Sequence, residues 1–115
     1  MLVKSEKNLT INQKKMLVST TELNLGTIQL ASSNKSTVTI TAELFEITVN
    51  SVIAGCGSCT TAAVDKKTVQ PAGVITLEID FRPTTKGINR KRVTLNIMEN
   101  ATNSVVHIYI NATVV

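Results

Sequence analysis

Hydrophobic and polar residues alternate along several short segments of the chain. In the clearest one, residues 74–81, every second side chain is a large apolar one. A period of two directs one set of side chains into a core and the other into solvent, as in a half-buried strand. Related patterns occupy residues 36–42, 44–50, 92–97 and 104–115, and residues 17–25 and 26–30 add a first strand with a bend. We find no convincing helical period.

These segments predict an all-β fold, an immunoglobulin-like antiparallel β-sandwich of about seven strands. We expect the sandwich domain to cover residues 16–115, with residues 1–15 as an extended N-terminal arm. The inward-facing positions of the three clearest strands define the expected core. They are Ile75, Leu77, Ile79, Phe81, Val93, Leu95, Ile97, Val106, Ile108 and Ile110.

The composition supports this fold class. Valine, isoleucine and threonine make up 41 of the 115 residues, and β-branched residues favour strands over helices. Aromatic residues make up only 3%. Binding of single-stranded nucleic acid is therefore not expected, because it uses aromatic stacking platforms. No apolar run is long enough for a membrane span or a secretory signal, so we expect a protein made in a cytoplasm without a signal peptide.

The N-terminal arm carries most of the chain's net charge of +4. It is either a solvated terminus or a tether that docks on an acidic surface of a protein partner. In the second interpretation, lysines meet acidic groups while apolar residues fill shallow grooves. The expected contact residues are Lys4, Lys7, Leu9, Ile11, Lys14 and Lys15.

A second group of basic residues surrounds the loop at residues 83–87. It comprises Arg82, Lys86, Arg90, Lys91 and Arg92. These cations either protect a strand edge from aggregation or form a second contact patch for an acidic partner, and for that patch we select Arg82, Lys86, Arg90 and Arg92. Neither basic region has the dense charge typical of a nucleic-acid-binding face, so no direct nucleic-acid partner is expected.

Cys56 and Cys59 are the only cysteines and form a C-x-x-C motif. They can be loop thiols or a local disulfide, part of a zinc site shared between subunits, or a redox pair. A zinc site needs four ligands, and His107 is the only histidine. No catalytic or phosphate-binding motif is present. We therefore expect a non-enzymatic protein without a cofactor.

The order of several motifs resembles bacterial immunoglobulin-like domains of the ASPM/SPD-2/Hydin and DUF1573 types. The resemblance rests on LVSTTELNLGTIQL at residues 17–30, TVTIT at 37–41, the turn Gln70-Pro71-Ala72-Gly73 and ITLEIDFRPTTKG at 75–87. The loop at residues 56–60 lies where the DUF1573 group carries a Cys-Gly-Cys-Thr-like sequence. The resemblance implies a binding or scaffolding module without catalytic activity.

Three functions are compatible with these features. The first is a structural component of a bacteriophage virion, such as a capsid decoration protein that contacts a major capsid protein or neighbouring subunits. The second is an exported cell-envelope or carbohydrate-binding module, for which Tyr109 is the candidate exposed aromatic residue. The third is a small redox or metal protein that uses its two cysteines.

Overall fold

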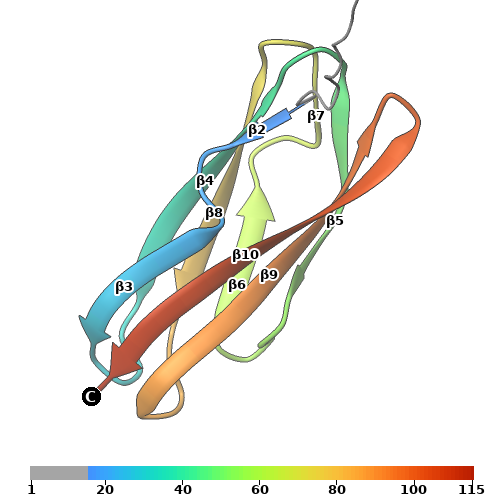
Figure 1. Cartoon of the computed structure of the whole chain (residues 1–115). Helices are drawn as coiled ribbons and strands as arrows, with labels where there is room; N and C mark the ends of the chain where they lie inside the picture. Colours follow the sequence, from blue (N-terminus) through green and yellow to red (C-terminus); the bar gives the residue numbers. More distant parts are fainter. Residues whose placement is uncertain (1–15) are drawn as a thin grey trace, which may run out of the picture.

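The computed structural model describes residues 16–115 as two β-sheets packed face to face (Figure 1). The described part of the chain contains nine strands and no helix. The strands are β2 (Met16–Val18), β3 (Glu22–Ile28), β4 (Asn34–Ala42), β5 (Ile47–Ala54), β6 (Thr60–Val64), β7 (Thr68–Val69), β8 (Val74–Phe81), β9 (Gly87–Glu99) and β10 (Thr102–Val114). The prediction of an immunoglobulin-like β-sandwich is confirmed.

One sheet has five strands in the order β3-β10-β9-β5-β7, and the other has four in the order β2-β4-β8-β6. The longest strands, β9 and β10, form a hairpin that runs along the five-stranded sheet (Figure 1). All strand pairs are antiparallel except β3 with β10, which run parallel. The first part of the domain therefore contributes to both sheets, β2 to one and β3 to the other.

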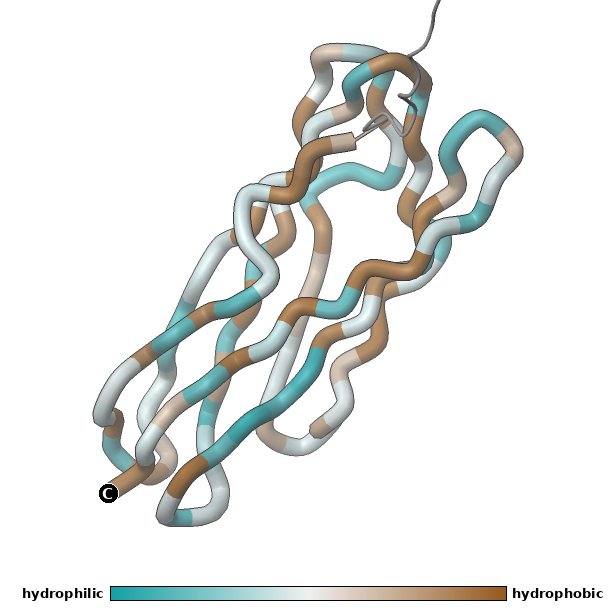
Figure 2. The backbone as a smooth tube through the Cα atoms, in the orientation of Figure 1, coloured by the Kyte–Doolittle hydropathy of each residue, from teal (hydrophilic) through white to brown (hydrophobic). Residues whose placement is uncertain are grey.

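The core lies between the inner faces of the two sheets. Its side chains are aliphatic apart from Phe81 and Cys59, and hydrophobic and hydrophilic residues alternate along the strands (Figure 2). Nine of the ten predicted core residues are buried. They are Ile75, Leu77, Ile79, Phe81, Val93, Leu95, Ile97, Ile108 and Ile110.

Val106 is the exception among the predicted core residues, because it is half-buried and packs against the margin of the core. Strand β3 pairs only with residues 109–114 of β10. The first part of β10 is therefore an uncovered sheet edge. The alternation places Val106 on the inner face, but it carries no information on where the neighbouring strand ends.

The predicted strand count and orientation need two corrections. Residues 17–30, expected to form a bent first strand and a short second one, instead contain β2 and β3, which belong to different sheets. In addition, the structure contains the two-residue strand β7, which the pattern did not predict. The parallel pairing of β3 with β10 departs from the expected all-antiparallel arrangement. Both differences depend on pairing between distant segments, which local alternation does not specify.

The strand predicted over residues 44–50 begins later and continues further, as β5 over Ile47–Ala54. Backbone hydrogen bonds hold the end of the preceding strand, since Ala42 pairs with Gly73 and Ala72. The chain then turns before β5 begins. A register shift between Val49 and Ser51 lets β5 continue beyond the point where the alternation changes phase.

The turn before β8 has a glycine, Gly73, at a position where there is no room for a side chain. Gly73 N donates to Gln70 O over 2.8 Å, which closes the turn, and the positive φ of 74° falls on Ala72. A side chain at Gly73 would place its Cβ 2.7 Å from Val69 Cβ and 2.8 Å from Gln70 O. Residue 73 therefore has to be glycine because the chain approaches it closely, whereas residue 72 holds an alanine in a conformation that favours glycine.

Replacing a central core residue should destabilise the domain strongly. We expect Leu95→Ala to lower the free energy of unfolding by about 2–5 kcal/mol, because it leaves a cavity between the sheets. Val105→Ala on the exposed face of the same hairpin should cost less than about 0.5 kcal/mol. Urea unfolding of both variants measures the difference, and a Leu95→Ala cost as small as that of the control would show that the register is wrong.

The turn residues should respond in opposite directions to substitution. We expect Ala72→Gly to stabilise the domain by about 0.5–1 kcal/mol, because glycine adopts a positive φ without the steric cost that alanine has. The greater conformational freedom of glycine in the unfolded chain offsets part of this gain. Gly73→Ala should destabilise it by about 1–3 kcal/mol through the clash with Val69. Thermal unfolding of the two variants gives the signs, and a stabilising Gly73→Ala would contradict the turn geometry.

Candidate functional site

The basic residues predicted around the loop at residues 83–87 do not form one patch. Arg82 follows β8 of the four-stranded sheet, and Lys86 lies in the loop itself. Arg90 and Arg92 lie on the exposed side of β9 in the five-stranded sheet. The sandwich therefore divides the predicted cluster between its two sheets.

Arg82 is neutralised locally. Its Nε lies 3.0 Å from Asp80 Oδ2, and the other carboxylate oxygen of Asp80 accepts a hydrogen bond from Ser33 Oγ over 2.8 Å. The Ser33 hydrogen bond, aided by Arg82, lowers the pKa of Asp80. This arrangement holds the start of β4 against the end of β8, and it accounts for Arg82 structurally.

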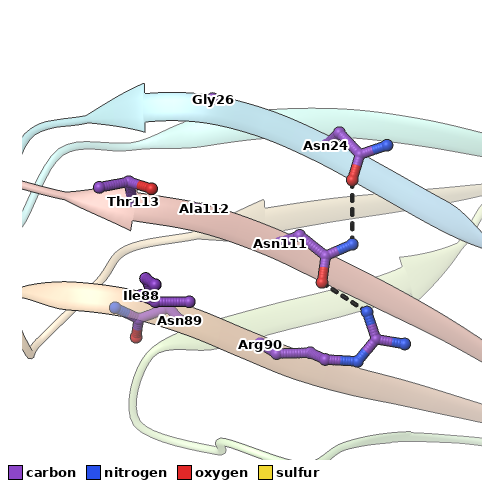
Figure 3. A pocket seen from close by; sticks show the side chains of 8 residues that line it. All are labelled: Asn24, Gly26, Ile88, Asn89, Arg90, Asn111, Ala112 and Thr113. Carbon is purple, nitrogen blue, oxygen red and sulfur yellow. Dashed lines mark hydrogen bonds between the residues drawn. The ribbon is translucent and has the colours of Figure 1, made fainter.

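Arg90 is at the centre of a polar network that crosses three strands. Its guanidinium donates to both carboxylate oxygens of Glu22 on β3, over 3.1 and 3.3 Å, and to Asn111 Oδ1 on β10 over 2.6 Å. Asn111 Nδ2 donates in turn to Glu22 Oε1 over 2.7 Å and to Asn24 Oδ1 over 3.0 Å. Figure 3 shows the row formed by Asn24, Asn111 and Arg90.

The same guanidinium lies over the ring of Tyr109, 4.0 Å from the ring centroid. It therefore combines an ion pair, an amide contact and a cation–π contact. The hydrogen bond from Arg90, followed by that from Asn111, lowers the pKa of Glu22, and Glu22 raises the pKa of Arg90. Sequence reasoning selected Arg90 but missed its partner Glu22, which is 68 residues away along the chain.

A shallow depression of about 370 Å³ lies beside this network, as Figure 3 shows. Gly26 lines the depression without a side chain, and its φ is +72°. Beside it, the register of β3 against β10 shifts between Asn111 and Ala112. Polar groups of Asn111 and Arg90 line one side, and Ile88 lines another with 91% of its surface exposed. The depression is open and joins the exposed face of the five-stranded sheet.

A second depression of about 340 Å³ lies on β9 close to the first. It is lined by Gly55, Arg90, Lys91, Arg92 and Tyr109. Here β5 has ended at Ala54, and Gly55 N donates to Arg92 O over 2.7 Å before the chain turns away. The two depressions share Arg90, and together they form the candidate binding face, defined by residues 24, 26, 55, 88–92, 109 and 111–113.

The two cysteines are joined by a disulfide across the loop between β5 and β6. Cys59 is 2% exposed and belongs to the core, whereas Cys56 is half-buried. Thr60 N and Cys59 N both donate to Cys56 O, so the loop is a compact turn. In this state neither sulfur is available as a metal ligand. Within residues 16–115 no group of three or more His, Cys, Asp or Glu could hold a metal ion.

The predicted contact residues of the N-terminal arm lie outside the described residues, so the tether stays a prediction. They are Lys4, Lys7, Leu9, Ile11, Lys14 and Lys15. Across the described range, no helix has the length and hydrophobicity needed to cross a membrane.

The chain belongs to a family of immunoglobulin-like domains. The family model described as "Protein of unknown function (DUF1573)" matches residues 16–114, which is almost the whole sequence. The resemblance predicted from the motifs is therefore confirmed. No curated protein matches the chain in sequence.

Solved structures of low sequence identity share the fold. VesB protease of Vibrio cholerae has a TM-score of 0.75 at 11% identity, covering 89% of this chain and 32% of that one. The secreted serine protease VesC of the same organism has a TM-score of 0.56 at 17% identity, covering 79% and 21%. The ASH/PapD-like domain 7 of human CEP192 has a TM-score of 0.69 at 7% identity, covering 100% and 94%. The chain thus spans about a third of VesB and a fifth of VesC.

The ion pair between Glu22 and Arg90 should make the stability of the domain depend on pH in the acidic range. Because the pKa of Glu22 is lowered from 4.5, its carboxylate stabilises the fold above that value, and this contribution is lost as pH falls through the folded-state pKa. We expect Glu22→Gln to weaken the decline in urea midpoint between about pH 5 and pH 3. Arg90→Gln should weaken it similarly, and a full decline in both variants would contradict the contact.

Proposed function

We propose that the chain is a non-catalytic immunoglobulin-like module of an exported protein, and that it binds its ligand or partner on the candidate binding face. The observation that carries this proposal is the disulfide between Cys56 and Cys59. Disulfides persist in oxidising compartments outside the cytosol and are rare within it. The buried position of Cys59 favours a structural bridge over a redox pair, because a reactive thiol needs access to its substrate.

The similar structures support the same proposal at the level of fold. One of them is a secreted serine protease, and this chain corresponds to about a fifth of it. An immunoglobulin-like module attached to a larger exported protein is therefore a known context for this fold. We infer an accessory role, since fold alone does not transfer the protease's activity to the module.

The polar side chains of the binding face and the adjacent Glu22 support a non-catalytic role. Glu22, Arg90 and Asn111 satisfy one another through close hydrogen bonds. A general acid or base needs a pKa near the operating pH, whereas the pKa of Glu22 is lowered by its partners. The network therefore suits a rigid recognition surface.

The virion interpretation, including a capsid partner, stays a prediction from the sequence. None of the similar structures described above belongs to a virion, and an exported module accounts better for the disulfide. The redox or metal interpretation is also less well supported, since both sulfur atoms are engaged in one bond.

The location and the redox state of the native protein test the proposal together. Cells that make the chain from its own gene are treated with a membrane-permeant alkylating agent, fractionated, and the chain is recovered with an antibody for mass spectrometry. We expect it in the exported fraction, with Cys56 and Cys59 unmodified until a reductant is added. A cytosolic chain with both cysteines alkylated, or a chain recovered only in phage particles, would overturn the proposal.

Removing the disulfide should lower stability moderately. It closes a loop of only four residues, for which the loop-closure relation gives about 2 kcal/mol. We expect Cys56→Ala/Cys59→Ala to lose roughly this amount in urea unfolding. Addition of a reductant should lower the midpoint of the wild-type protein but leave that of the double variant unchanged. An equal response of both proteins would show that the bridge does not form.

A further inference from the structure

We propose that Lys14, two residues before β2, pairs with the buried carboxylate of Glu99 and so fastens the N-terminal arm to its own domain. Lys14 lies outside the described residues, and the inference rests on the environment of Glu99 and on the place where β2 begins. It gives Lys14 a partner within the chain, whereas the tether interpretation gives it one on another protein. It is independent of the proposed function, because it involves neither the binding face nor the compartment.

Glu99 is a buried acid with an unsatisfied oxygen. It is the last residue of β9, and its side chain continues the alternation of the buried core residues of that strand, which points between the sheets. The residue is only 4% exposed, and among residues 16–115 its Oε2 has no hydrogen-bond partner. A buried carboxylate is costly unless a cation or hydrogen bonds compensate it. Glu99 therefore calls for a cation at this end of the core.

The described part of the chain supplies no such cation. The strand neighbours of Glu99 are Thr102 on β10 and Ile47 on β5, and both are uncharged. None of the ion pairs within residues 16–115 includes Glu99. Lys66 and Lys67 precede β7, but β5 lies between β7 and β9. The counter-charge must come from outside the described range.

The segment before β2 enters at the same end of the sandwich as Glu99. Strand β2 begins at Met16, which pairs with Ala42 at the end of β4. From Ala42 the chain crosses to Ile47, the first residue of β5, and Ile47 pairs with Glu99. Figure 1 shows that β2 starts at the end that also holds β7 and the turn between β9 and β10. Facing sheets are about 10 Å apart, a gap that a lysine and a glutamate side chain can bridge.

The alternation along β2 selects Lys14 from the two adjacent lysines. Met16 and Val18 pack against the core, whereas Leu17 is 51% exposed. The same period of two, continued backward along the sequence, assigns Lys14 to the inner set and Lys15 to the outer set. Lys14 is therefore the lysine expected between the sheets.

The other acids near this end have less to gain from a cation. Glu43 and Glu46, in the turn between β4 and β5, are exposed, and Gln70 Nε2 donates to Glu46 Oε2 over 2.6 Å. An exposed ion pair contributes little to stability, whereas a cation beside a buried carboxylate removes the cost of an unpaired charge. Burial thus favours Glu99 as the partner of Lys14.

A double-mutant cycle in the full chain tests the pair by urea unfolding. We expect Lys14→Gln to lower the equilibrium constant for folding at least about tenfold, because it leaves Glu99 unpaired. In the Glu99→Gln background the same change should cost less than about twofold, because no carboxylate remains. Two matched controls remove a neighbouring charge of each sign. Lys15→Gln and Glu43→Gln should each change the constant less than about twofold and show no coupling to the pair.

The other outcomes overturn the inference. An equal effect of Lys14→Gln in both backgrounds shows that the two residues do not interact, and coupling of Glu99 to Lys15 shows that the alternation does not continue before β2. A urea midpoint that rises with protein concentration in the wild type but not in Lys14→Gln shows that the lysine reaches a second copy. None of these failures bears on the location and redox state of the cysteines, so the proposed function would stand.

Discussion

The alternation of side chains along paired strands is the constraint from which the surface of this domain follows. On β9 the inward set includes Val93, Leu95 and Ile97, and all three are fully buried. A slip of one residue would expose this set and bury Arg92 and its polar neighbours, which is far too costly to occur. The core therefore fixes which residues of β9 face outward. The candidate binding face is a consequence of the same register that stabilises the fold.

The edge strand β3 depends on this surface in a second way. It pairs with β10 alone, and Gly26 interrupts the regular register near its end. The contacts from Glu22 and Asn24 to β10 and β9 add a side-chain connection on the outer face. A recognition surface that also fastens an edge strand has limited freedom to move, because loosening Arg90 would loosen β3. This coupling explains how a sheet without helices keeps a preorganised polar face.

Much of the fold could be predicted from the sequence, because alternation is a local signal. It identified the sandwich and placed nine of ten expected residues in the core. The parallel pairing of β3 and the pairing of Arg90 with Glu22 could not be predicted, since they join segments at least 68 residues apart. The sequence predicted the disulfide only as one of several interpretations of the C-x-x-C motif. Two cysteines three residues apart are compatible with a disulfide, a metal site or free thiols.

Arg90 and Arg92 show why a cluster of cations in a sequence does not define a binding site by itself. They lie two residues apart on the same face of one strand, so a sequence pattern treats them as equivalent. Their environments differ because β3 places Glu22 beside Arg90, while β5 ends at Ala54 and the residue that follows it beside Arg92 is Gly55, which has no side chain. One arginine therefore connects strands, and the other has no acidic partner within residues 16–115. Which strand lies beside which arginine depends on the whole topology, so the sequence pattern alone does not show which cation has a structural role.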